Sequence, residues 1–477
     1  MRYVLNLAYL SLLIALSPWW IYAAIFQGKY CEGYREKLFG LVPRRSGVRK
    51  CIWMHAVSVG EVNLLQSLVD RLPEVFPGWD CCISTTTKTG FDLANKKYSG
   101  HTVFYCPLDF SWSVAAAMRR VRPDMVLLVE LELWPNLVAA ACHRGAKVAI
   151  ANGRLSEHSA RGYGRIRWFV KRILRGLDLV AVQNEEYAQR FIQLGADYES
   201  VSVTGSIKFD GAETERANSK TRELAKLAGI GDQDVVFLAG STQHPEESLA
   251  LQTFARLRSK HPELRLVLIP RHPNRFDEVA RLLETTGIPW QRRSELSSTK
   301  SQAKAQAELP SPKSRMLLVD TVGELGAWWG TARIAFVGGS MGSRGGQNMI
   351  EPAAYGAAVS FGPKTKNFRD VVRLLRDGNA VQIVRDGDQL HAFVQRCLEE
   401  PTWATQLGTR AQKIVRQQLG ATERTLMLLA NLAFGRSVAR AGDDPLERPR
   451  IALPSSENHA STESTRHNSE CRRKKSA

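Results

Sequence analysis

The segment Cys51-Ile-Trp-Met-His-Ala-Val-Ser-Val-Gly-Glu61 carries the pattern from which the fold class of this chain can be predicted. Residues 51–57 form an apolar run of strand length, and Gly60 supplies the tight turn that follows. An amphipathic helical pattern then covers residues 62–72. An apolar strand that passes through a turn into a helix is typical of a parallel sheet covered by helices on both faces. The stretch therefore predicts an α/β fold.

The same alternation of apolar runs and helical patterns continues along the chain. In the first half, further runs of strand length occupy residues 81–86, 103–106, 125–129, 147–151, 179–183 and 201–204. After a polar stretch at 210–231, the runs resume at residues 235–239, 265–269, 316–319, 334–337, 357–361 and 380–384. Two such series predict two doubly wound, Rossmann-like α/β domains.

With 477 residues, the chain is long enough for two hydrophobic cores and appendages. We expect an anchor and a basic segment over residues 1–45, a first Rossmann-like domain over 46–212 and a second over 213–436. Residues 437–477 are rich in Ser, Arg, Pro and Glu, which predicts a disordered basic tail. Because doubly wound sheets bind ligands at the carboxyl ends of their strands, we expect two ligands to meet in a cleft between the domains.

The N-terminus predicts a membrane anchor. Residues 4–26 carry no charge and are numerous enough to cross a hydrocarbon core of about 30 Å. Pro18 and the Trp19-Trp20 pair favour the alternative of a helix that lies along the membrane surface. Residues 27–50 hold seven cations against two acids, which predicts a basic collar on the cytoplasmic side that contacts anionic lipids. A cleaved signal peptide fits less well, because only Arg2 precedes the apolar run and no clear cleavage site follows.

Composition narrows the classes of function. The 44% hydrophobic and 23% charged content are those of an ordinary globular protein. None of the eight cysteines has C-x-x-C spacing, so we expect reduced thiols and neither a disulfide framework nor a zinc site. The net charge of +18 suits a polyanion, but no nucleic-acid-binding motif accompanies it, and we expect no nucleic-acid partner.

Three predicted strand ends in the second half suit a nucleotide. Arg271 follows residues 265–269, where it suits a phosphate or, equally, a surface ion pair. A glycine-rich loop follows residues 334–337 and matches neither the Walker A nor the G-x-G-x-x-G pattern. Glu351, just beyond this loop, suits a ribose or simply a helix N-terminus. A third turn follows residues 316–319, and three such turns at one sheet edge indicate a nucleotide donor.

The first half offers candidate catalytic residues. Glu61 begins a helix, where a carboxylate could act as a general base, but Ser58 and Glu61 also have the spacing of a capping box, which the sequence alone favours. Glu130 follows another predicted strand, together with Glu132, and either orients a partner or is an ordinary loop charge. Lys208 lies where the first domain ends and could neutralise a leaving phosphate. The Asp386-Gly-Asp388 sequence resembles a metal–nucleotide motif, but its position indicates a turn and helix start, and we assign no metal.

These residues belong to a series of motifs through which the chain resembles the 3-deoxy-D-manno-octulosonic acid (Kdo) transferases of lipopolysaccharide synthesis. The resemblance runs from the anchor to about residue 435. The motifs that carry it are His55-Ala-Val-Ser-Val-Gly-Glu61, Glu130-Leu-Glu-Leu-Trp-Pro-Asn136, Ala151-Asn-Gly-Arg-Leu-Ser156, Gln183-Asn-Glu-Glu186, Thr204-Gly-Ser-Ile-Lys-Phe-Asp210, Pro270-Arg-His-Pro273 and the loop at 338–352. The chain departs from the family at Gln347, where the family often has His, in much of 294–310 and in its basic tail.

The resemblance implies a glycosyltransferase-B fold, with an acceptor-binding first domain and a donor-binding second domain. It implies CMP-Kdo as a substrate, a lipid A precursor as the acceptor, no cofactor, and catalytic domains on the cytoplasmic face of a bacterial inner membrane. It makes Glu61 the proton acceptor, in place of the capping role, and Glu130 and Lys208 transition-state stabilisers. It also implies inversion of the anomeric centre without a metal. The implied CMP-contacting residues are Pro270, Arg271, Val322, Gly323, Glu324, Asn348, Met349, Ile350 and Glu351.

Two alternatives remain open on the sequence. One is another membrane-associated glycosyltransferase-B enzyme that uses a UDP-sugar and a lipid-linked acceptor. The other is a membrane-tethered nucleotide- or nucleic-acid-binding protein without catalysis. The net charge of +18 is compatible with this alternative, because it would attract a polyanion. The second alternative predicts nucleic-acid binding that weakens steeply with salt.

Overall fold

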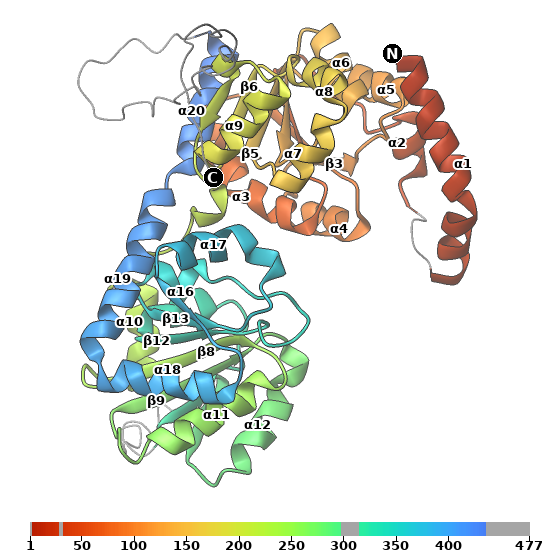
Figure 1. The fold of residues 1–477 in the computed structure, drawn as a ribbon. Coiled ribbons are helices and arrows are strands. Elements are labelled where there is room, and N and C mark those ends of the chain that lie inside the picture. The colour runs from red at the N-terminus through yellow and green to blue at the C-terminus, as the bar shows by residue number, and fades with distance from the viewer. Residues whose placement is uncertain (1, 28–31, 297–313, 436–477) are drawn as a thin grey trace, which may run out of the picture. The chain divides into compact units, whose positions relative to one another are not determined.

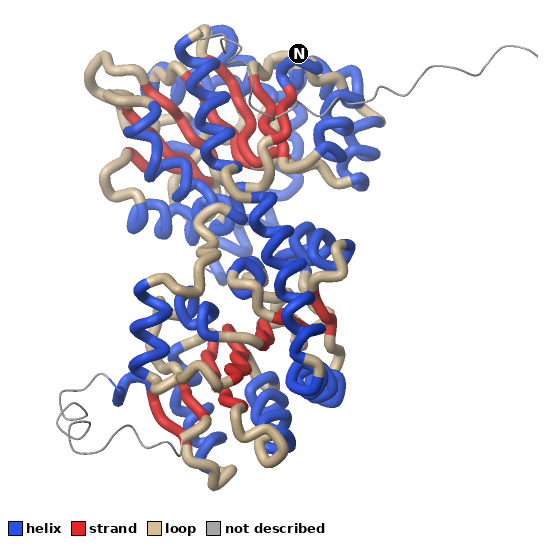
Figure 2. The backbone as a smooth tube through the Cα atoms, turned by 90° about the vertical axis from the view of Figure 1, so that its left-hand side faces the viewer, coloured by secondary structure: helices blue, strands red, loops and turns tan. Residues whose placement is uncertain are grey.

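The computed structural model describes residues 2–27, 32–296 and 314–435. The predicted tail at 437–477 lies outside the described residues, as does most of the divergent stretch at 294–310. The described chain contains two seven-stranded sheets, each with helices on both sides (Figures 1 and 2). Every strand pair in the described residues is parallel, which confirms the predicted architecture of two doubly wound α/β domains.

The first sheet has the strand order β3-β2-β1-β4-β5-β6-β7. Its strands are β1 (Cys51–His55), β2 (Asp80–Thr85), β3 (Thr102–Tyr105), β4 (Met125–Val129), β5 (Lys147–Gly153), β6 (Leu179–Val182) and β7 (Val201–Val203). Its helices are α2 (Tyr34–Phe39), α3 (Val59–Val75), α4 (Lys88–Lys97), α5 (Ser111–Val121), α6 (Pro135–His143), α7 (Glu157–Gly164), α8 (Arg167–Leu174) and α9 (Glu185–Leu194), with short turns η1 (Tyr198–Ser200) and η2 (Ile207–Phe209).

The second sheet has the order β10-β11-β9-β8-β12-β13-β14. Its strands are β8 (Val235–Thr242), β9 (Leu264–Pro270), β10 (Trp290–Arg292), β11 (Met316–Leu318), β12 (Ile334–Val337), β13 (Ala358–Phe361) and β14 (Val381–Ile383). Its longer helices are α10 (Ser219–Leu227), α11 (Glu246–Leu257), α12 (Phe276–Glu284), α17 (Arg369–Asp377), α18 (Gly387–Glu399) and α19 (Pro401–Gln418). Its short helices and turns are η3 (Pro273–Arg275), α13 (Arg293–Leu296), α15 (Leu325–Trp328), η4 (Trp329–Thr331), α16 (Ile350–Ala354) and η5 (Lys366–Phe368).

The apolar runs form these strands because both faces of each sheet are covered. Every residue of β1 and β4 is buried. In β8, Val236 and Leu238 join one hydrophobic cluster while Phe237 and Ala239 join another. Alternate side chains of a strand point to opposite faces, so each of the two clusters lies on its own side of the second sheet. Burial on both faces explains why the strands are nearly continuous in apolar residues.

The last described helix, α20 (Ala421–Phe434), packs on the first domain. Leu426 and Leu429 are buried in the same cluster as Ile52 and Leu65. The sequence assigned all of 213–436 to the second domain, and the structure corrects that assignment for this helix. The sequence of an amphipathic helix shows which of its faces is buried but not which sheet buries that face. The sequence therefore did not indicate that α20 returns to the first domain.

The N-terminal helix α1 (Arg2–Gln27) is docked onto the first domain by polar contacts near its start. The Asn6 side chain donates to Ser111 Oγ at 2.7 Å and accepts from the Ser111 amide at 2.9 Å. The Tyr9 hydroxyl donates to Asp109, whose carboxylate also accepts from the Asn136 and Leu137 amides at the start of α6. Burial raises the pKa of Asp109 to about 6. Within the described residues, no helix has the length and hydropathy needed to cross a bilayer, so the predicted transmembrane span is not supported.

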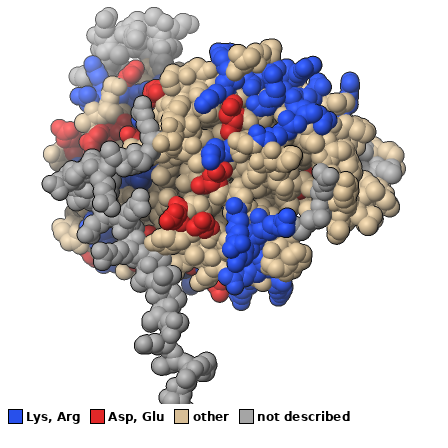
Figure 3. Space-filling model, turned by 90° about the horizontal axis from the view of Figure 1, so that it is seen from above, with Lys and Arg blue, Asp and Glu red and all other residues tan. Residues whose placement is uncertain are grey.

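The basic segment before the first sheet is partly structural. Arg45 has a side chain only 10% exposed, which pairs with Asp80 and donates to the carbonyl oxygens of Val121 and Arg122. Lys37 lies 4.1 Å from the centre of the Tyr105 ring. The predicted collar is therefore not uniformly available to lipid. On the face seen in Figure 3, Lys and Arg side chains gather in separate groups.

Candidate functional site

A cavity of about 730 Å³ opens at the carboxyl ends of the first sheet's strands. From the first domain, its lining includes all three predicted catalytic residues, Glu61, Glu130 and Lys208. From the second domain, its lining includes residues of η5 and α17. The topology explains why Glu61 and Glu130 meet. β1 and β4 are parallel neighbours, and the chain leaves them toward helices on opposite faces, which is the point where such sheets bind ligands.

Glu61 closes a capping box at the start of α3 and also lines the cavity. Its carboxylate accepts from the Val57 amide at 2.8 Å and from the Ser58 hydroxyl at 2.9 Å, while its own amide donates to Ser58 Oγ at 3.4 Å. The predicted capping role is therefore confirmed, and it does not exclude a role in the cavity. Burial is the main cause that raises the pKa of Glu61 above its ordinary value, and the charge of Glu130 adds to the rise.

Glu130 lies between two cations at the floor of the cavity. Its carboxylate is 2.7 Å from Arg154 Nε and 3.3 Å from Lys208 Nζ. Its backbone has φ +60°, an unusual value for a residue with a side chain. The structure thus brings Glu130 and Lys208 into contact in one cavity, and it adds Arg154, which directly follows β5.

Lys208 is placed by a neighbouring asparagine. The Asn152 side chain accepts from the Ile207 amide at 3.0 Å, which fixes the start of η2. The carbonyl oxygen of Asn152 in turn accepts from the Gln183 side chain at 3.0 Å. Asn152 is fully buried and has φ +56°. Asn152, with its left-handed backbone at the end of β5, thus connects η2, which contains Lys208, with Gln183 after β6.

Glu132 is a further acid of the cavity that the sequence left undecided. Burial and the charge of Glu61 raise the pKa of Glu132 to about 7. Its carboxylate accepts from Trp134 Nε1 at 2.9 Å. The sequence signal for Glu132 was a pair of acids, one residue apart, after a strand. Only the folded loop shows that the charge of Glu61 acts on Glu132 and raises its pKa.

The second domain contributes a charged wall to the cavity. Asp370 accepts from the Tyr187 hydroxyl at 2.9 Å and lies 3.5 Å from Arg154 Nη1. Arg373 pairs with Glu186 at 3.5 Å. Lys366 and Arg369, at the start of this wall, also line the cavity. The cavity is thus polar, lined by both carboxylates and cations, which suits a hydroxylated and charged ligand.

The nine predicted CMP-contacting residues lie at or after the ends of strands of the second sheet, and none of them lines this cavity. Asn348 donates to Glu351 at 2.9 Å, and burial raises the pKa of Glu351 while the charge of nearby Arg271 opposes the rise. Arg271 is exposed, and its amide donates to the Thr242 carbonyl oxygen at 3.0 Å. The remaining members of the predicted set are Pro270, Val322, Gly323, Glu324, Met349 and Ile350, of which Met349 and Ile350 are buried in the core of the second domain.

Glu324 has a structural role that its sequence did not show. Its carboxylate accepts from Arg293 Nε at 3.0 Å and Nη2 at 2.7 Å, which is a bidentate ion pair. It also accepts from the Thr321 hydroxyl at 2.8 Å and from Trp328 Nε1 at 3.2 Å. The adjacent Val322 is 77% exposed. Within this turn, Val322 and Gly323 are thus the residues more open to a ligand.

The glycine-rich loop is held from within by Glu246, which is 1% exposed. One oxygen of its carboxylate accepts from the amides of Ser340 and Met341, each at 2.9 Å. The other oxygen accepts from the amides of Gly339 at 2.7 Å and Gln243 at 2.9 Å. A carboxylate of the protein therefore occupies the amides that a phosphate uses in many glycine-rich loops.

The Asp386-Gly-Asp388 sequence caps a helix, as predicted. Asp386 accepts from the Gln389 amide at 2.8 Å at the start of α18, and Asp388 pairs with Arg256. In the parts of the chain that the structure describes, no three His, Cys, Asp or Glu side chains are grouped so that they could hold a metal ion.

Comparisons of the sequence with known proteins identify one family. The family model described as 3-deoxy-D-manno-octulosonic-acid transferase (kdotransferase) matches residues 32–211. The 3-deoxy-D-manno-octulosonic acid transferase of Haemophilus influenzae is 33% identical over 382 residues, covering 79% of this chain and 86% of the relative. That of Bordetella pertussis is 34% identical over 390 residues, with the same coverage. A UDP-GlcNAc 2-epimerase structure from Neisseria meningitidis, 12% identical, matches with a TM-score of 0.51 over 80% of this chain and 99% of its own, a likeness of fold alone.

Proposed function

This chain belongs to the family of 3-deoxy-D-manno-octulosonic acid transferases and is a glycosyltransferase, and we propose that it moves Kdo from CMP-Kdo to a lipid A precursor such as lipid IVA in lipopolysaccharide synthesis, with Glu61 as the general base. The observation that carries the proposal is the position of Glu61, which lines a polar cavity beside Glu130 and Lys208. The resemblance assigns catalytic roles to these same three residues.

The chemical step needs a base and a stabilised leaving group. In the proposed reaction, Glu61 takes the proton of a sugar hydroxyl on the acceptor, and the oxygen bonds to the anomeric carbon of Kdo. The bond from that carbon to the CMP phosphate oxygen breaks, and the electron pair leaves with CMP. Attack from the face opposite CMP inverts the anomeric centre. A raised pKa suits a group that must hold a proton during the step and release it afterwards.

Cations of the protein, rather than a metal, are proposed to meet the charge that develops on CMP. Lys208 lies in the cavity, 3.3 Å from Glu130, and Arg271 follows β9 at the edge of the second sheet. Positioned charges of this kind stabilise a transition state because they need no reorganisation during the reaction. Glu130 supports the proposal through its contacts, since it holds both Lys208 and Arg154 in place.

We propose that α1 holds the enzyme at the cytoplasmic face of a bacterial inner membrane by lying in the interface. Apolar side chains are exposed along the whole helix, among them Leu7 at 66%, Ile14 at 61% and Phe26 at 72%. An exposed apolar surface of this extent favours a membrane or protein partner. A membrane location would bring the cavity to a lipid-linked acceptor.

The test is incubation of the full chain with CMP-Kdo and a tetra-acylated lipid A precursor, followed by mass spectrometry of the lipid. The expected result is a lipid heavier by one or more Kdo residues. Competition with CMP and with UDP separates the proposal from the UDP-sugar alternative. Product formed only from a UDP-sugar, or salt-sensitive binding of nucleic acid without any transfer, would refute the proposal.

The role of Glu61 has its own test. Glu61→Gln keeps an oxygen that accepts from the Val57 amide, so the cap at α3 should survive, while the base is lost. We expect kcat to fall about 10²- to 10⁴-fold, with an unchanged Kd for CMP. In the wild type, activity should decline toward acid pH with a midpoint above the ordinary pKa of glutamate, because burial raises the pKa of Glu61.

The matched control is Glu74→Gln. Glu74 lies on the same helix, its side chain is 71% exposed, and it does not line the cavity. Its kcat should equal that of the wild type. Near-normal turnover by Glu61→Gln would show that another group takes the proton.

A further inference from the structure

One loop connects the predicted nucleotide residues with the catalytic cavity. The nucleotide residues follow strands of the second sheet and lie outside the cavity, whereas Glu61, Glu130 and Lys208 line it. A donor whose nucleotide is bound at the sheet edge must therefore extend its sugar toward the cavity. The segment 362–369 follows β13, contacts the glycine-rich loop and contributes Lys366 and Arg369 to the cavity lining.

The position of this segment is fixed by backbone contacts with the glycine-rich loop. The Lys364 amide donates to the Ser340 carbonyl oxygen at 2.9 Å, and the Asn367 amide donates to that of Gly345 at 2.9 Å. The Asn367 side chain donates to the carbonyl oxygens of Arg344 at 2.9 Å and Gly346 at 3.3 Å. The two loops therefore form one hydrogen-bonded unit that leads into Asn348 and Glu351.

Lys366 is packed directly on this unit. Gly345 has φ +92°, and a methyl group placed on it would lie 2.4 Å from Lys366 Cγ. The stem of Lys366 thus crosses the bare backbone of Gly345 while the side chain reaches the cavity. This close approach explains why a glycine is needed there.

The cations of the cavity differ in whether they already have a partner. Arg154 and Lys208 pair with Glu130, and Arg373 pairs with Glu186. Across residues 2–27, 32–296 and 314–435, neither Lys366 nor Arg369 forms an ion pair with a carboxylate or donates a side-chain hydrogen bond. Two exposed cations at one end of a polar cavity are available to an anionic ligand.

We propose that Lys366 and Arg369 bind the carboxylate of the transferred sugar and so select an acidic sugar as the donor. This inference rests on the proposed function. In a 2-keto acid sugar the carboxylate is attached to the anomeric carbon, the atom that the acceptor attacks. Holding the carboxylate at the end of the loop unit places that carbon between the nucleotide and Glu61, while Lys208 remains with the leaving group.

The experiment compares Lys366→Ala, Arg369→Ala and the double variant with the wild type. It measures KM for CMP-Kdo, KM for the lipid acceptor and Kd for CMP, which lacks the sugar. A charge-assisted hydrogen bond corresponds to about tenfold or more in affinity. We expect each single variant to raise KM for CMP-Kdo by about that factor and the double variant to raise it further, while Kd for CMP and KM for the acceptor stay unchanged. Lys366→Arg, which keeps the charge, should restore most of the affinity for CMP-Kdo.

The matched control is Lys364→Ala. Lys364 is exposed in the same segment but does not line the cavity, so its loss should leave all three constants unchanged. A double variant with wild-type KM for CMP-Kdo would overturn the inference. A rise in KM for the acceptor alone would also overturn it, because these cations would then bind an acceptor phosphate. An equal loss of CMP affinity would do the same by showing damage to the nucleotide site. Failure of the proposed function is distinguishable, since the wild type itself would then neither bind CMP nor transfer Kdo.

Discussion

At the scale of single residues, three carboxylates of the cavity differ in their partners. Glu130 is neutralised by Arg154 and Lys208, whereas Glu61 and Glu132 have hydrogen bonds but no ion pair in the described chain. Burial raises the pKa of both Glu61 and Glu132. Catalytic sites often place neighbouring acids in environments that give them different pKa values. Glu61 and Glu132 thus share a raised pKa, beside a Glu130 that is paired with two cations.

Glu132 should make stability depend on pH. Its pKa is about 7 in the folded protein against 4.5 ordinarily, so the folded state keeps a proton that the unfolded chain has released. The stabilisation by that proton is complete below about pH 4.5 and is lost as pH rises through about 7. Glu132→Gln, which stays neutral and can still accept from Trp134, should raise Tm over the wild type at pH 8 and not at pH 4.5. Thermal unfolding monitored by circular dichroism measures both values.

The control for this titration is Glu157→Gln, because the Glu157 side chain is 70% exposed on α7. Its Tm difference from the wild type should be the same at both pH values. A Glu132→Gln variant whose Tm difference is also independent of pH would contradict the assignment of the raised pKa.

Gly345→Ala tests the packing beneath Lys366. The substitution adds a methyl group 2.4 Å from Lys366 Cγ at φ +92°, so the lysine must move. We expect a rise in KM for CMP-Kdo comparable to that of Lys366→Ala. Steady-state kinetics measure it against Gly342→Ala, where an added methyl group meets nothing within 4 Å. Equal KM values for the two glycine variants would show that Lys366 does not depend on Gly345.

Residue roles were only partly predictable from the sequence. Spacing indicated that Ser58 and Glu61 cap a helix, and the structure confirms it. Glu324 looked like a ligand contact, yet its ion pair with Arg293 joins residues from different segments, which spacing does not show. The role of the buried Glu246 carboxylate is not predictable for the same reason, since three of its four amide partners lie 93 to 95 positions further along the chain.

At the scale of elements, the ends of strands position the chemistry. Glu61 follows β1, Glu130 follows β4 and Arg154 follows β5, and these three strands are parallel neighbours. The carboxyl ends of parallel neighbours lie at one sheet edge, so residues about 90 positions apart share one cavity. Strand order rather than sequence order therefore sets the composition of the cavity.

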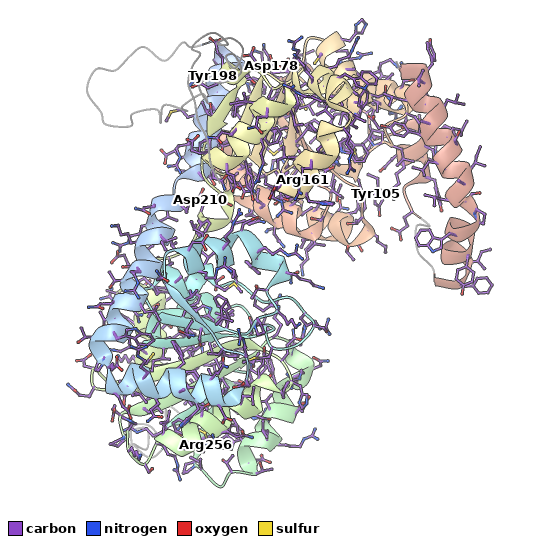
Figure 4. All side chains as sticks on the ribbon, viewed as in Figure 1. Tyr105, Arg161, Asp178, Tyr198, Asp210 and Arg256 are labelled. Atoms are coloured by element: carbon purple, nitrogen blue, oxygen red, sulfur yellow. The ribbon has the colours of Figure 1, made fainter. Side chains whose placement is uncertain are left out.

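Asp210 is a cap that secures the crossing helix α20. Its carboxylate accepts from the Gly420 amide at 2.7 Å and also from the Thr422 amide, at the place labelled in Figure 4. Asp210→Ala removes both contacts and should lower the free energy of unfolding by about 1–2 kcal/mol. Urea unfolding measures the change.

The comparison variant for Asp210→Ala is Asp386→Ala, which removes a similar cap from α18. A loss confined to Asp386→Ala would contradict the role of Asp210. Because α20 packs in the core of the first domain, Asp210→Ala should also expose Leu426 and Leu429 to proteolysis more than Asp386→Ala does.

Thirteen of the fourteen strands in the described chain were predictable, because each of them contains a short apolar run and most of them are buried. The exception is β10, a three-residue edge strand of partly exposed Trp, Gln and Arg. Its pattern is that of a loop, because an edge strand buries less surface. The packing partner of α20 was not predictable either, since helical amphipathicity carries no information about which sheet covers it.

At the scale of the whole molecule, charge and apolar exposure are unevenly distributed. Some of the +18 net charge is committed to internal contacts, as Arg45 illustrates, while α1 exposes apolar side chains along its length. The polar contacts of Asn6 and Tyr9 hold this helix on the first domain. Membrane attachment through α1 would therefore also orient the first domain, the one to which we assign acceptor binding.

The membrane proposal predicts that the double variant Leu7→Glu, Ile14→Glu binds lipid poorly. Each substitution places a charge on the exposed apolar surface of α1, where partition into an interface becomes unfavourable. Cosedimentation with vesicles that contain anionic lipid should fall several-fold, while Kd for CMP stays unchanged. Met427→Glu, a substitution of an exposed apolar residue on α20, is the control and should bind vesicles as the wild type does. Undiminished cosedimentation of the double variant would place the attachment elsewhere.

The buried carboxylate of Glu246 has a consequence for turnover. Because an internal group already satisfies the amides of the glycine-rich loop, the loop acquires its working shape when the chain folds, before any guest arrives. The conformational entropy of the loop is then lost once, during folding, and not in every catalytic cycle. Under the proposed function, the loop would keep this shape after the nucleotide leaves, and no reordering of the loop would precede binding of the next donor.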